Sequence, residues 1–357
     1  MEKAHFIENR VFRDKRGTFS PLDLAKLDKN WVQSNISTNP QKFTLRGLHF
    51  QKNEYAQAKL IKVISGKILD FVIDMRTVSE DYNKVFFFEM NEGDEVLIPN
   101  PGYPTYTSVT KLVGATPVFY DLIEDNNWEP DFEKLDQQDL SKVKMMWVSY
   151  PHMPTGATGS LNLFKRIVAF AKKHHILVIN DNPYSFVLNE NPISILQVDG
   201  AKEVALELNS LSKTYNMAGW RVGMVSGKSD YIEAILRVKS NMDSGMFYGI
   251  QKGAIEALKL EKTWFKEQNV IYQKRRKLTF ELAKKLGCTY DENSVGLFVW
   301  AKLPQEILSA EDFVDKILYK KDIFITPGTV FGSNGEGFIR FSLCVKEEKI
   351  KEAILRF

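Results

Sequence analysis

Cysteine and long apolar runs are scarce in this sequence, and their scarcity excludes several classes of protein. The chain of 357 residues has two cysteines, Cys288 and Cys344, which provide neither a disulfide framework nor metal-ligand spacing. No run approaches the roughly 20 apolar residues of a membrane span. The N-terminal stretch MEKAHFIENRVF lacks the continuous apolar core of a signal peptide. We therefore expect a cytoplasmic protein without a metal site or a membrane partner.

An excess of charge of one sign is also lacking. The formal net charge is +3, which gives no reason to expect a nucleic-acid partner. The densest basic run, KRRK at 274–277, falls in a stretch of helical character, where a solvated helix face is the favoured interpretation. With 44% hydrophobic and 26% charged residues the composition is that of an ordinary globular protein. The length suits two or three domains.

The chain changes character near residue 90. Before this point, KLIKVI (59–64) and KILDFVID (67–74) flank Ser65-Gly66, a pattern that predicts two strands joined by a tight turn. The N-terminal part therefore has the character of β-structure.

From about residue 110, strands and helices alternate. LNLFKRIVAFAKKHH (161–175) has apolar residues at helical spacing, and Ser160 is suited to cap this helix. ILVIND (176–181) follows as a short apolar strand that ends in a carboxylate, and VALEL (204–208) is a second strand followed by a polar loop. The alternation predicts an α/β fold with an open, mostly parallel sheet, whose chemistry lies at the carboxyl ends of its strands.

One lysine stands out in the segment LNSLSKTYNMAGWRVGMVSG (208–227). Lys213 follows a predicted strand, with hydroxyl groups at Ser210 and Ser212 and a guanidinium at Arg221. Hydroxyl groups and an arginine form a suitable cup for a phosphate. A lysine beside such a cup is a candidate Schiff-base nucleophile. The alternative is an ordinary loop lysine near a helix.

The pattern S-x-S-K-x-x-x-M-A-G-W-R-x-G around this lysine resembles the motif of the pyridoxal-phosphate-dependent class I/II aminotransferases. The resemblance extends in order over roughly three quarters of the chain, from about residue 92. It implies an α/β, three-layer fold of type I, incomplete at its N-terminal side, with a smaller C-terminal α+β domain. The other matching segments are GDEVLIPNPGYPTY (93–106), YPHMPTG (150–156), NDNPY (180–184) and TPGTVFGSNGEGFIRFSLC (326–344).

The resemblance implies a role for each of three residues near the cofactor ring. Lys213 would form the Schiff base with pyridoxal phosphate and then move the proton between the substrate Cα and the cofactor. Asp181 would pair with the pyridine nitrogen, and Tyr184 would hydrogen-bond the phenolic oxygen of the ring. A simple turn residue before Asn182-Pro183 is the alternative for Asp181.

Four further residues receive roles from the same resemblance. Tyr103 would stack on the ring face, although a loop tyrosine could equally serve packing. Ser210 and Arg221 would hold the cofactor phosphate. Arg340 would bind the substrate α-carboxylate as a bidentate pair, the alternative being an arginine on a surface strand.

The resemblance also implies domains and partners. We expect a large cofactor-binding domain over residues 91–258 and a small domain over 259–357. Strand-like runs at GLFVWAKLP (296–304) and GFIRFSLC (337–344) belong to the latter. The partners would be an amino acid, a 2-oxo acid and a second copy of the chain in a homodimer. The sequence does not separate acidic, aromatic and aliphatic amino acids.

Two departures from the family pattern accompany the match. Met153 stands where many family members have an asparagine that contacts the cofactor. The family also has a segment before GDEVLIP that carries a strand of the large sheet, a phosphate-binding turn at a helix N-terminus and an aromatic residue that reaches the partner's site. We find no counterpart of that segment here.

Residues 1–90 resemble a different family. The segments that match are FRDKRGTFSPL (12–22), WVQSNIS (31–37), LRGLHFQ (45–51) and QAKLIKVISGKILDFVIDMR (57–76). They are similar to the first half of dTDP-4-dehydrorhamnose 3,5-epimerase, a cupin-type β-fold, so the expected domain is a partial cupin-like β segment.

By this second resemblance, His49 would be the base that removes the sugar proton and Lys59 would stabilise the enolate oxygen. Arg16 and Arg46 would contact the nucleotide diphosphate. The second half of the epimerase fold, with its tyrosine acid and the aspartate that orients the histidine, has no counterpart in the sequence.

Three hypotheses follow for the function. The favoured one is a pyridoxal-phosphate-dependent aminotransferase, which predicts covalent cofactor binding at Lys213. The second is an epimerase-like nucleotide-sugar module on residues 1–90, which predicts dTDP-sugar binding without a cofactor. The third is an inactive fusion of two incomplete proteins, which predicts weak thermal cooperativity.

Overall fold

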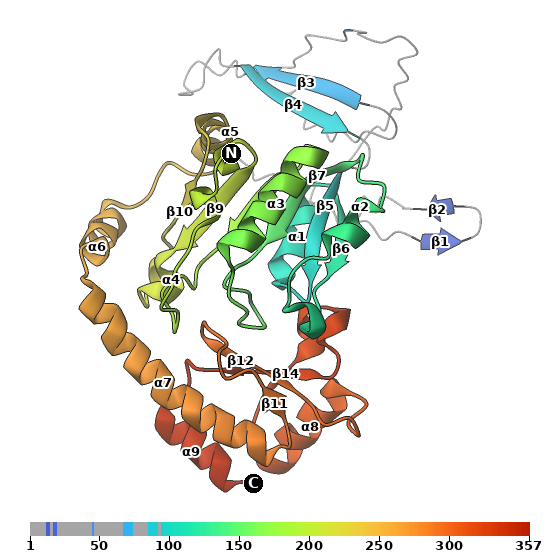
Figure 1. Ribbon diagram of the computed structural model, residues 1–357. Helices are drawn as coiled ribbons and strands as arrows, with labels where there is room; N and C mark the ends of the chain where they lie inside the picture. Colours follow the sequence, from blue (N-terminus) through green and yellow to red (C-terminus); the bar gives the residue numbers. More distant parts are fainter. Residues whose placement is uncertain (1–11, 15–16, 20–44, 46–66, 74–84, 92–93) are drawn as a thin grey trace, which may run out of the picture. The chain divides into compact units, whose positions relative to one another are not determined.

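The computed structural model (Figure 1) describes residues 12–14, 17–19, 45, 67–73, 85–91 and 94–357. The chain divides into two compact units, Met1–Glu92 and Gly93–Phe357. Each unit is described by itself.

The described part of the first unit consists of two antiparallel strand pairs. The predicted strand at 67–74 is confirmed as β3, and its described partner is β4 rather than the segment 59–64, which lies outside the described residues. The strands are β1 (Phe12–Asp14), β2 (Gly17–Phe19), β3 (Lys67–Ile73) and β4 (Val85–Asn91).

The second unit is built on a six-stranded sheet in the order β10-β9-β8-β7-β5-β6. All neighbouring pairs are parallel except β10 with β9, which confirms the predicted open and mostly parallel sheet. The strands are β5 (Glu95–Asn100), β6 (Thr116–Asp121), β7 (Val143–Val148), β8 (Leu177–Asp181), β9 (Ala205–Ser210) and β10 (Gly223–Ser226).

Both faces of this sheet are covered, which produces three layers. Successive residues of a strand point to opposite faces. On β5, Leu97 belongs to one buried cluster with Phe164 of α3, whereas Val96 and Ile98 belong to another with Tyr106 of α1. This arrangement explains why β5 is apolar at consecutive positions instead of alternating.

Helix α3 shows how local sequence sets an element. The Ser160 hydroxyl accepts a hydrogen bond from the Leu163 backbone N–H at 3.0 Å, which caps the first turn as predicted. The helix buries Leu163, Phe164 and Ile167 and ends before His175, which has a left-handed backbone.

The remaining helices connect and flank the sheets. The α-helices are α1 (Pro104–Leu112), α2 (Phe132–Asp136), α3 (Leu161–His174), α4 (Leu211–Thr214), α5 (Ser229–Met242), α6 (Tyr248–Leu258), α7 (Lys262–Lys285), α8 (Ala310–Lys321) and α9 (Glu347–Leu355). The 3₁₀ helices are η3 (Glu124–Asn126), η4 (Ile195–Gln197), η5 (Ala201–Glu203), η6 (Ala218–Trp220), η7 (Gly328–Phe331) and η8 (Ser333–Gly335).

A second, antiparallel sheet has the order β11-β12-β14-β13, and the long helix α7 and helix α9 lie side by side near it (Figure 1). It confirms the strand-like runs predicted around 296–304 and 337–344. Its strands are β11 (Thr289–Tyr290), β12 (Phe298–Lys302), β13 (Thr326–Pro327) and β14 (Phe338–Ser342).

The basic run at 274–277 corrects one expectation. Its two lysines are exposed, whereas both arginines are half-buried and donate to backbone carbonyls of the protein. Arg275 donates to the Leu343 carbonyl at 3.1 Å and Arg276 to the Ser294 carbonyl at 2.8 Å. The solvated-face interpretation is wrong for the arginines, because they tie α7 to the small sheet.

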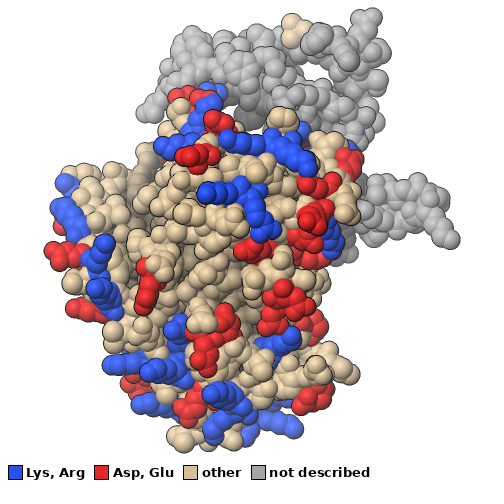
Figure 2. All heavy atoms as spheres, in the orientation of Figure 1, with Lys and Arg blue, Asp and Glu red and all other residues tan. Residues whose placement is uncertain are grey.

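On the visible face of the described residues, acidic and basic side chains are interspersed (Figure 2). None of the helices in the described part of the chain combines the length and the apolar character that crossing a membrane requires.

Candidate active site

The candidate site lies at the carboxyl ends of the parallel strands. Asp181 is the last residue of β8, and Ser210 is the last residue of the neighbouring β9. Tyr103 follows the end of β5 and precedes α1. Carboxyl ends of parallel strands meet at one edge of a sheet, where ligands of open α/β folds bind. The sheet order therefore brings together residues that are far apart in sequence.

Asp181 is held by hydrogen bonds from a residue of α1 and a residue that follows β7. The Tyr106 hydroxyl donates to Asp181 Oδ2 at 2.7 Å, and the Ser149 hydroxyl donates to the Asp181 carbonyl at 2.9 Å. Burial raises the pKa of Asp181, and the hydrogen bond from Tyr106 acts in the opposite direction. Because burial disfavours its negative charge, the Asp181 carboxylate would be stabilised by a cationic partner, such as a protonated pyridine nitrogen.

Tyr106 was not predicted as a site residue. Its ring stacks on Trp147 with 4.6 Å between centroids. Burial first, and then the charge of Asp181, raise the pKa of Tyr106 well above its ordinary value, so the hydroxyl stays a proton donor. The repeated tyrosine in the string GYPTY was the available sequence signal.

Tyr184 lies near three other predicted residues. Burial, followed by the negative charge of Asp181, raises the pKa of Tyr184, whereas the positive charge of Arg340 lowers it. The ring of Tyr103 meets the ring of Tyr106 edge-on at 5.7 Å, and 45% of Tyr103 is exposed. The structure therefore brings Asp181, Tyr184, Tyr103 and Arg340 together, with one aromatic ring open for stacking.

Lys213 lies on the single-turn helix α4, which follows directly after β9. The Ser210 hydroxyl caps this turn by accepting from the Ser212 N–H at 3.0 Å. The Thr214 hydroxyl donates to the Pro183 carbonyl at 3.0 Å. That bond fixes the lysine-bearing turn to the loop between Asp181 and Tyr184.

Arg221 belongs to the loop that leads into β10. Its backbone is left-handed, with φ of 53°, and its Nη1 donates to the Ala218 carbonyl of the same loop at 2.8 Å. Gly223, two residues on, pairs with Ser210 across the β9–β10 ladder. The two predicted phosphate ligands thus lie on adjoining segments, and the arginine is exposed.

Arg340 lies on β14 between two aromatic rings. Its guanidinium carbon is 4.0 Å from the centroid of Phe298 and 4.5 Å from that of Phe331. Nη1 donates to the Met153 sulfur at 3.5 Å, while Nε is buried without a hydrogen-bond partner among the described residues. A half-buried cation that has no carboxylate partner among the described residues is suited to bind the carboxylate of a ligand.

Glu207 is a buried carboxylate that sequence analysis missed. Its oxygens accept from the side-chain amides of Asn180 at 3.3 Å and Asn182 at 3.2 Å, the two neighbours of Asp181. They also accept from the Ser194 hydroxyl at 2.8 Å and the Ile195 N–H at 3.0 Å. The signal was a glutamate inside the apolar run VALEL.

The epimerase-like candidates His49, Lys59, Arg16 and Arg46 lie outside the described residues.

These side chains fit pyridoxal phosphate. A lysine lies beside the turn that carries a half-buried carboxylate and a buried tyrosine, and an exposed tyrosine ring is available for stacking. Comparison with known proteins agrees, since residues 81–357 match the family model described as aminotransferase class I and II. The chain belongs to the class I and II aminotransferases. Its cofactor is pyridoxal phosphate, and its substrates are amino acids and 2-oxo acids.

Curated aminotransferases support this assignment. The LL-diaminopimelate aminotransferase of Dehalococcoides mccartyi is 40% identical over 269 residues, which cover 75% of this chain and 69% of that protein. The enzyme of the same name from Halothermothrix orenii is 41% identical over 272 residues, covering 76% and 70%.

Solved aminotransferase-family structures are similar as well. Apo-BacF from Bacillus subtilis has a TM-score of 0.70 and 36% identity over 75% of this chain and 68% of that one. An aminotransferase from Staphylococcus aureus has a TM-score of 0.69 and 33% identity, covering 75% and 71%.

The N-terminal part matches a second family model. Residues 1–155 match the model described as dTDP-4-dehydrorhamnose 3,5-epimerase, which overlaps the aminotransferase match over residues 81–155. The two matches confirm the predicted join of an epimerase-like part to an aminotransferase. The relatives do not favour the epimerase alternative for the function of the chain.

Proposed function

We propose that this aminotransferase takes the amino group from LL-diaminopimelate and passes it to a 2-oxo acid, with Lys213 as the residue that carries the cofactor. The proposal for the donor is supported by the several relatives of that name, which are 37–41% identical to the chain. Bound pyridoxal phosphate supplies an electron sink for the electrons left when the substrate loses its α-proton.

The protein groups around the ring would each do one task. Lys213 Nζ would accept the α-proton of the substrate. The Asp181 carboxylate would hold the ring nitrogen of the cofactor, and Tyr106 keeps that carboxylate in place through the bond at 2.7 Å. Tyr184 would donate to a cofactor oxygen, since its raised pKa keeps the hydroxyl protonated. Tyr103 would cover the face of the ring.

The cofactor phosphate would bind between β9 and the loop before β10. Ser210 and Arg221 provide a hydroxyl and a guanidinium there, on segments that the β9–β10 ladder holds side by side. Arg221 would exchange its bond with the Ala218 carbonyl for the phosphate oxygens.

We propose Arg340 as the residue that binds the substrate carboxylate. It combines a buried Nε without a partner among the described residues with a stacked position between Phe298 and Phe331. Such a cation binds a carboxylate without first breaking an ion pair. The charge of Arg340 lowers the pKa of Tyr184, which supports the proximity of the carboxylate site to the ring site.

We further propose the domain division at residues 258 and 259 and a boundary between residues 90 and 91. Helix α6 ends at Leu258 and α7 begins at Lys262. One of the buried clusters lies between Leu97 and Ala205, and another is formed mostly by residues after α6.

A homodimer is proposed on the basis of α5 and α6. Helix α5 has no buried residue, although its apolar side chains gather on one face, as in an amphipathic helix that packs against a partner. The apolar side chains exposed along α5 and the segment into α6 are Ile235, Leu236, Val238, Met242, Met246, Phe247 and Tyr248. A second copy of the chain would cover this surface. A cytoplasmic location is proposed from the two free cysteines, Cys288 and Cys344.

The deciding experiment detects the covalent bond between pyridoxal phosphate and Lys213. The purified chain is titrated with pyridoxal phosphate, reduced with borohydride and mapped by mass spectrometry, and Lys213→Arg serves as the matched variant. We expect a stable adduct on Lys213 in the parent chain, followed by amino transfer from LL-diaminopimelate across a panel of 2-oxo acids. A chain without a specific adduct on Lys213 would contradict the proposal and favour an inactive fusion.

A further inference from the structure

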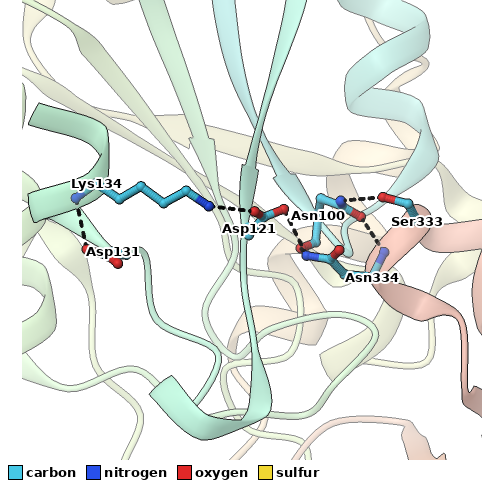
Figure 3. A network of polar contacts seen from close by, with 6 residues as sticks. All are labelled: Asn100, Asp121, Asp131, Lys134, Ser333 and Asn334. Atoms are coloured by element: carbon cyan, nitrogen blue, oxygen red, sulfur yellow. Dashed lines mark hydrogen bonds and ion pairs between the residues drawn. The ribbon is translucent and has the colours of Figure 1, made fainter. Parts of the chain in front are cut away.

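A polar network joins the end of β5 to the loop at η7 and η8 (Figure 3). Asn100, the last residue of β5, is buried. Its Nδ2 donates to the Ser333 hydroxyl at 2.8 Å, and its Oδ1 accepts from the Asn334 backbone N–H at 3.1 Å. Both ends of one amide side chain are therefore used to hold the same loop.

Asn334 also donates two side-chain hydrogen bonds to residues of the large sheet. Its Nδ2 donates to the Asn100 carbonyl at 3.1 Å and to Asp121 Oδ1 at 2.9 Å. Asp121, at the end of β6, also pairs with Lys134 through its other oxygen at 3.0 Å (Figure 3). Partial burial raises the pKa of Asp121, but the hydrogen bonds from Lys134 and Asn334 outweigh it and lower the pKa overall. The acceptor for Asn334 therefore stays ionised at neutral pH.

The network lies next to two parts of the candidate site, the segment that leads to Tyr103 and the ring of Phe331 that stacks on Arg340. On one side, Asn100 is followed by the short segment that leads to Tyr103. On the other side, the Gly102 N–H donates to the carbonyl of Phe331, whose ring lies 4.5 Å from the Arg340 guanidinium. The loop that Asn334 anchors thus contains the ring that stacks on Arg340.

The backbone of the loop approaches Asn100 so closely that no other residue fits at position 332. Gly332 has φ of 129°, and a Cβ atom placed on it would lie 2.2 Å from Asn100 Oδ1. Only glycine satisfies both conditions. The approach of Gly332 allows the amide of Asn100 to reach Ser333 and Asn334 at once.

We propose that Asn334, held by Asn100 and Asp121, is a positioning residue for the substrate carboxylate, because it keeps Phe331 against the guanidinium of Arg340. The inference rests on the proposed role of Arg340 in amino transfer. Without the bonds of Asn334 the loop would populate other conformations, and the affinity for a carboxylate falls in proportion to the fraction that remains competent.

The test measures carboxylate binding and cofactor capture separately. Succinate serves as the probe, since it has two carboxylates and no amine that could react with the cofactor. Asn334→Ala is expected to raise the dissociation constant of succinate about tenfold, which corresponds to roughly one-tenth of the chains keeping the competent loop. Calorimetric titration of the full chain with pyridoxal phosphate bound gives this constant. The yield of the borohydride-reduced adduct on Lys213 is expected to stay at the parent value.

Two matched variants complete the test. Thr329→Ala removes a hydroxyl of the same loop that donates to exposed Glu311 at 2.8 Å, outside the network, and should leave succinate binding unchanged. Ser333→Ala removes one bond of Asn100 and should weaken binding about threefold, as expected for a single neutral hydrogen bond. Ser333→Ala also serves as the milder variant if Asn334→Ala fails to fold in a thermal unfolding check.

The outcomes separate the inference from the proposed function. A parent chain without an adduct on Lys213 contradicts the proposed function. Equal succinate affinity in the parent, Asn334→Ala and Ser333→Ala chains overturns the positioning role, whatever the adduct yield. A loss of adduct that parallels the loss of succinate binding also overturns it, because a general structural role would affect both.

Discussion

Around Asp181 the side chains are buried and bonded, whereas beyond β9 the same sheet ends in exposed residues. Tyr106 and Ser149 donate hydrogen bonds to Asp181 itself. Glu207 accepts hydrogen bonds from Asn180 and Asn182, the two neighbours of Asp181 in the chain. On the other side, three of the four residues of β10 are exposed, and α5 buries none. The residues proposed to hold the cofactor ring are preorganised, whereas Arg221, proposed together with Ser210 to bind the cofactor phosphate, is exposed.

The chain covers about 69% of the LL-diaminopimelate aminotransferase from Dehalococcoides mccartyi. The packed residues around Asp181 and the exposed residues of β10 and α5 both lie within the matched residues 81–357. The difference therefore lies inside the aminotransferase part of the chain. Substitutions on the two sides of the site test this difference.

The largest effect is expected for Glu207→Ala on the buried side. The change leaves four donors around Asp181 without their acceptor, two of them the amides of Asn180 and Asn182. We expect the free energy of unfolding to fall by about 3 kcal/mol or more, measured by chemical denaturation. Exposed Glu203, which pairs with Lys172 at 3.5 Å, provides the control, since Glu203→Ala should change stability by less than about 0.5 kcal/mol. Equal effects of the two changes would mean that the Glu207 network is not stabilising.

Asp181→Asn separates catalysis from stability. The amide keeps the volume and can accept from Tyr106, but it cannot hold a protonated pyridine nitrogen by charge. Amino transfer is expected to slow about 100-fold or more. The cofactor-free chain should not lose stability, because burial raises the pKa of Asp181 and its charge is therefore unfavourable there. Steady-state rates and unfolding curves are compared with exposed Asp199→Asn, and an unimpaired rate would exclude the ring-nitrogen role.

Acid should destabilise the YPHMPTG loop through His152. The imidazole is buried, its Nδ1 is 2.8 Å from the Thr155 hydroxyl, and burial lowers the pKa of His152 to about 3. Below the unfolded pKa of about 6.5, the unfolded chain binds a proton that the folded chain does not, so stability falls as the pH drops. Between pH 7 and pH 5 the loss should be about 2 kcal/mol.

The matched variant for this effect is His152→Gln, which has no titrating group in the same window. Unfolding free energies of parent and variant are measured at pH 7 and pH 5. The parent should lose about 2 kcal/mol more than the variant. An identical loss in both chains would show that other groups cause the acid sensitivity.

The smallest effect on stability is expected on the open side. Leu236 of α5 is 56% exposed, so Leu236→Ser should change the free energy of unfolding by less than about 0.5 kcal/mol. The same change should weaken self-association if α5 lies in the dimer interface, which sedimentation over a range of concentrations detects. Leu308→Ser, at a residue 90% exposed elsewhere on the unit, is the control. A dimer that is unaffected by Leu236→Ser would place the interface elsewhere.

The local elements followed from the sequence because their signals are local. Ser160 and the apolar spacing after it determine α3, and the run before Asp181 determines β8. The lysine motif led to Lys213, and the resemblance supplied Asp181, Tyr184 and Arg340. The structure brings Asp181, Tyr184 and Arg340 together.

Contacts between distant residues did not follow from the sequence. Tyr106 is 75 residues from Asp181, and Asn100 is 234 residues from Asn334. Both bonds depend on the strand order of the sheet and on how a later loop packs against it. The same holds for Arg275, whose charge suggested solvent but whose position on α7 directs it to a carbonyl.

In the described part of the chain β10 ends the large sheet, and only one of its sides is paired there, with β9. A strand edge of this kind recognises another chain through main-chain N–H and C=O groups, almost without regard to side-chain identity. An extended peptide supplied from outside would therefore lengthen the sheet by pairing with the open side of β10.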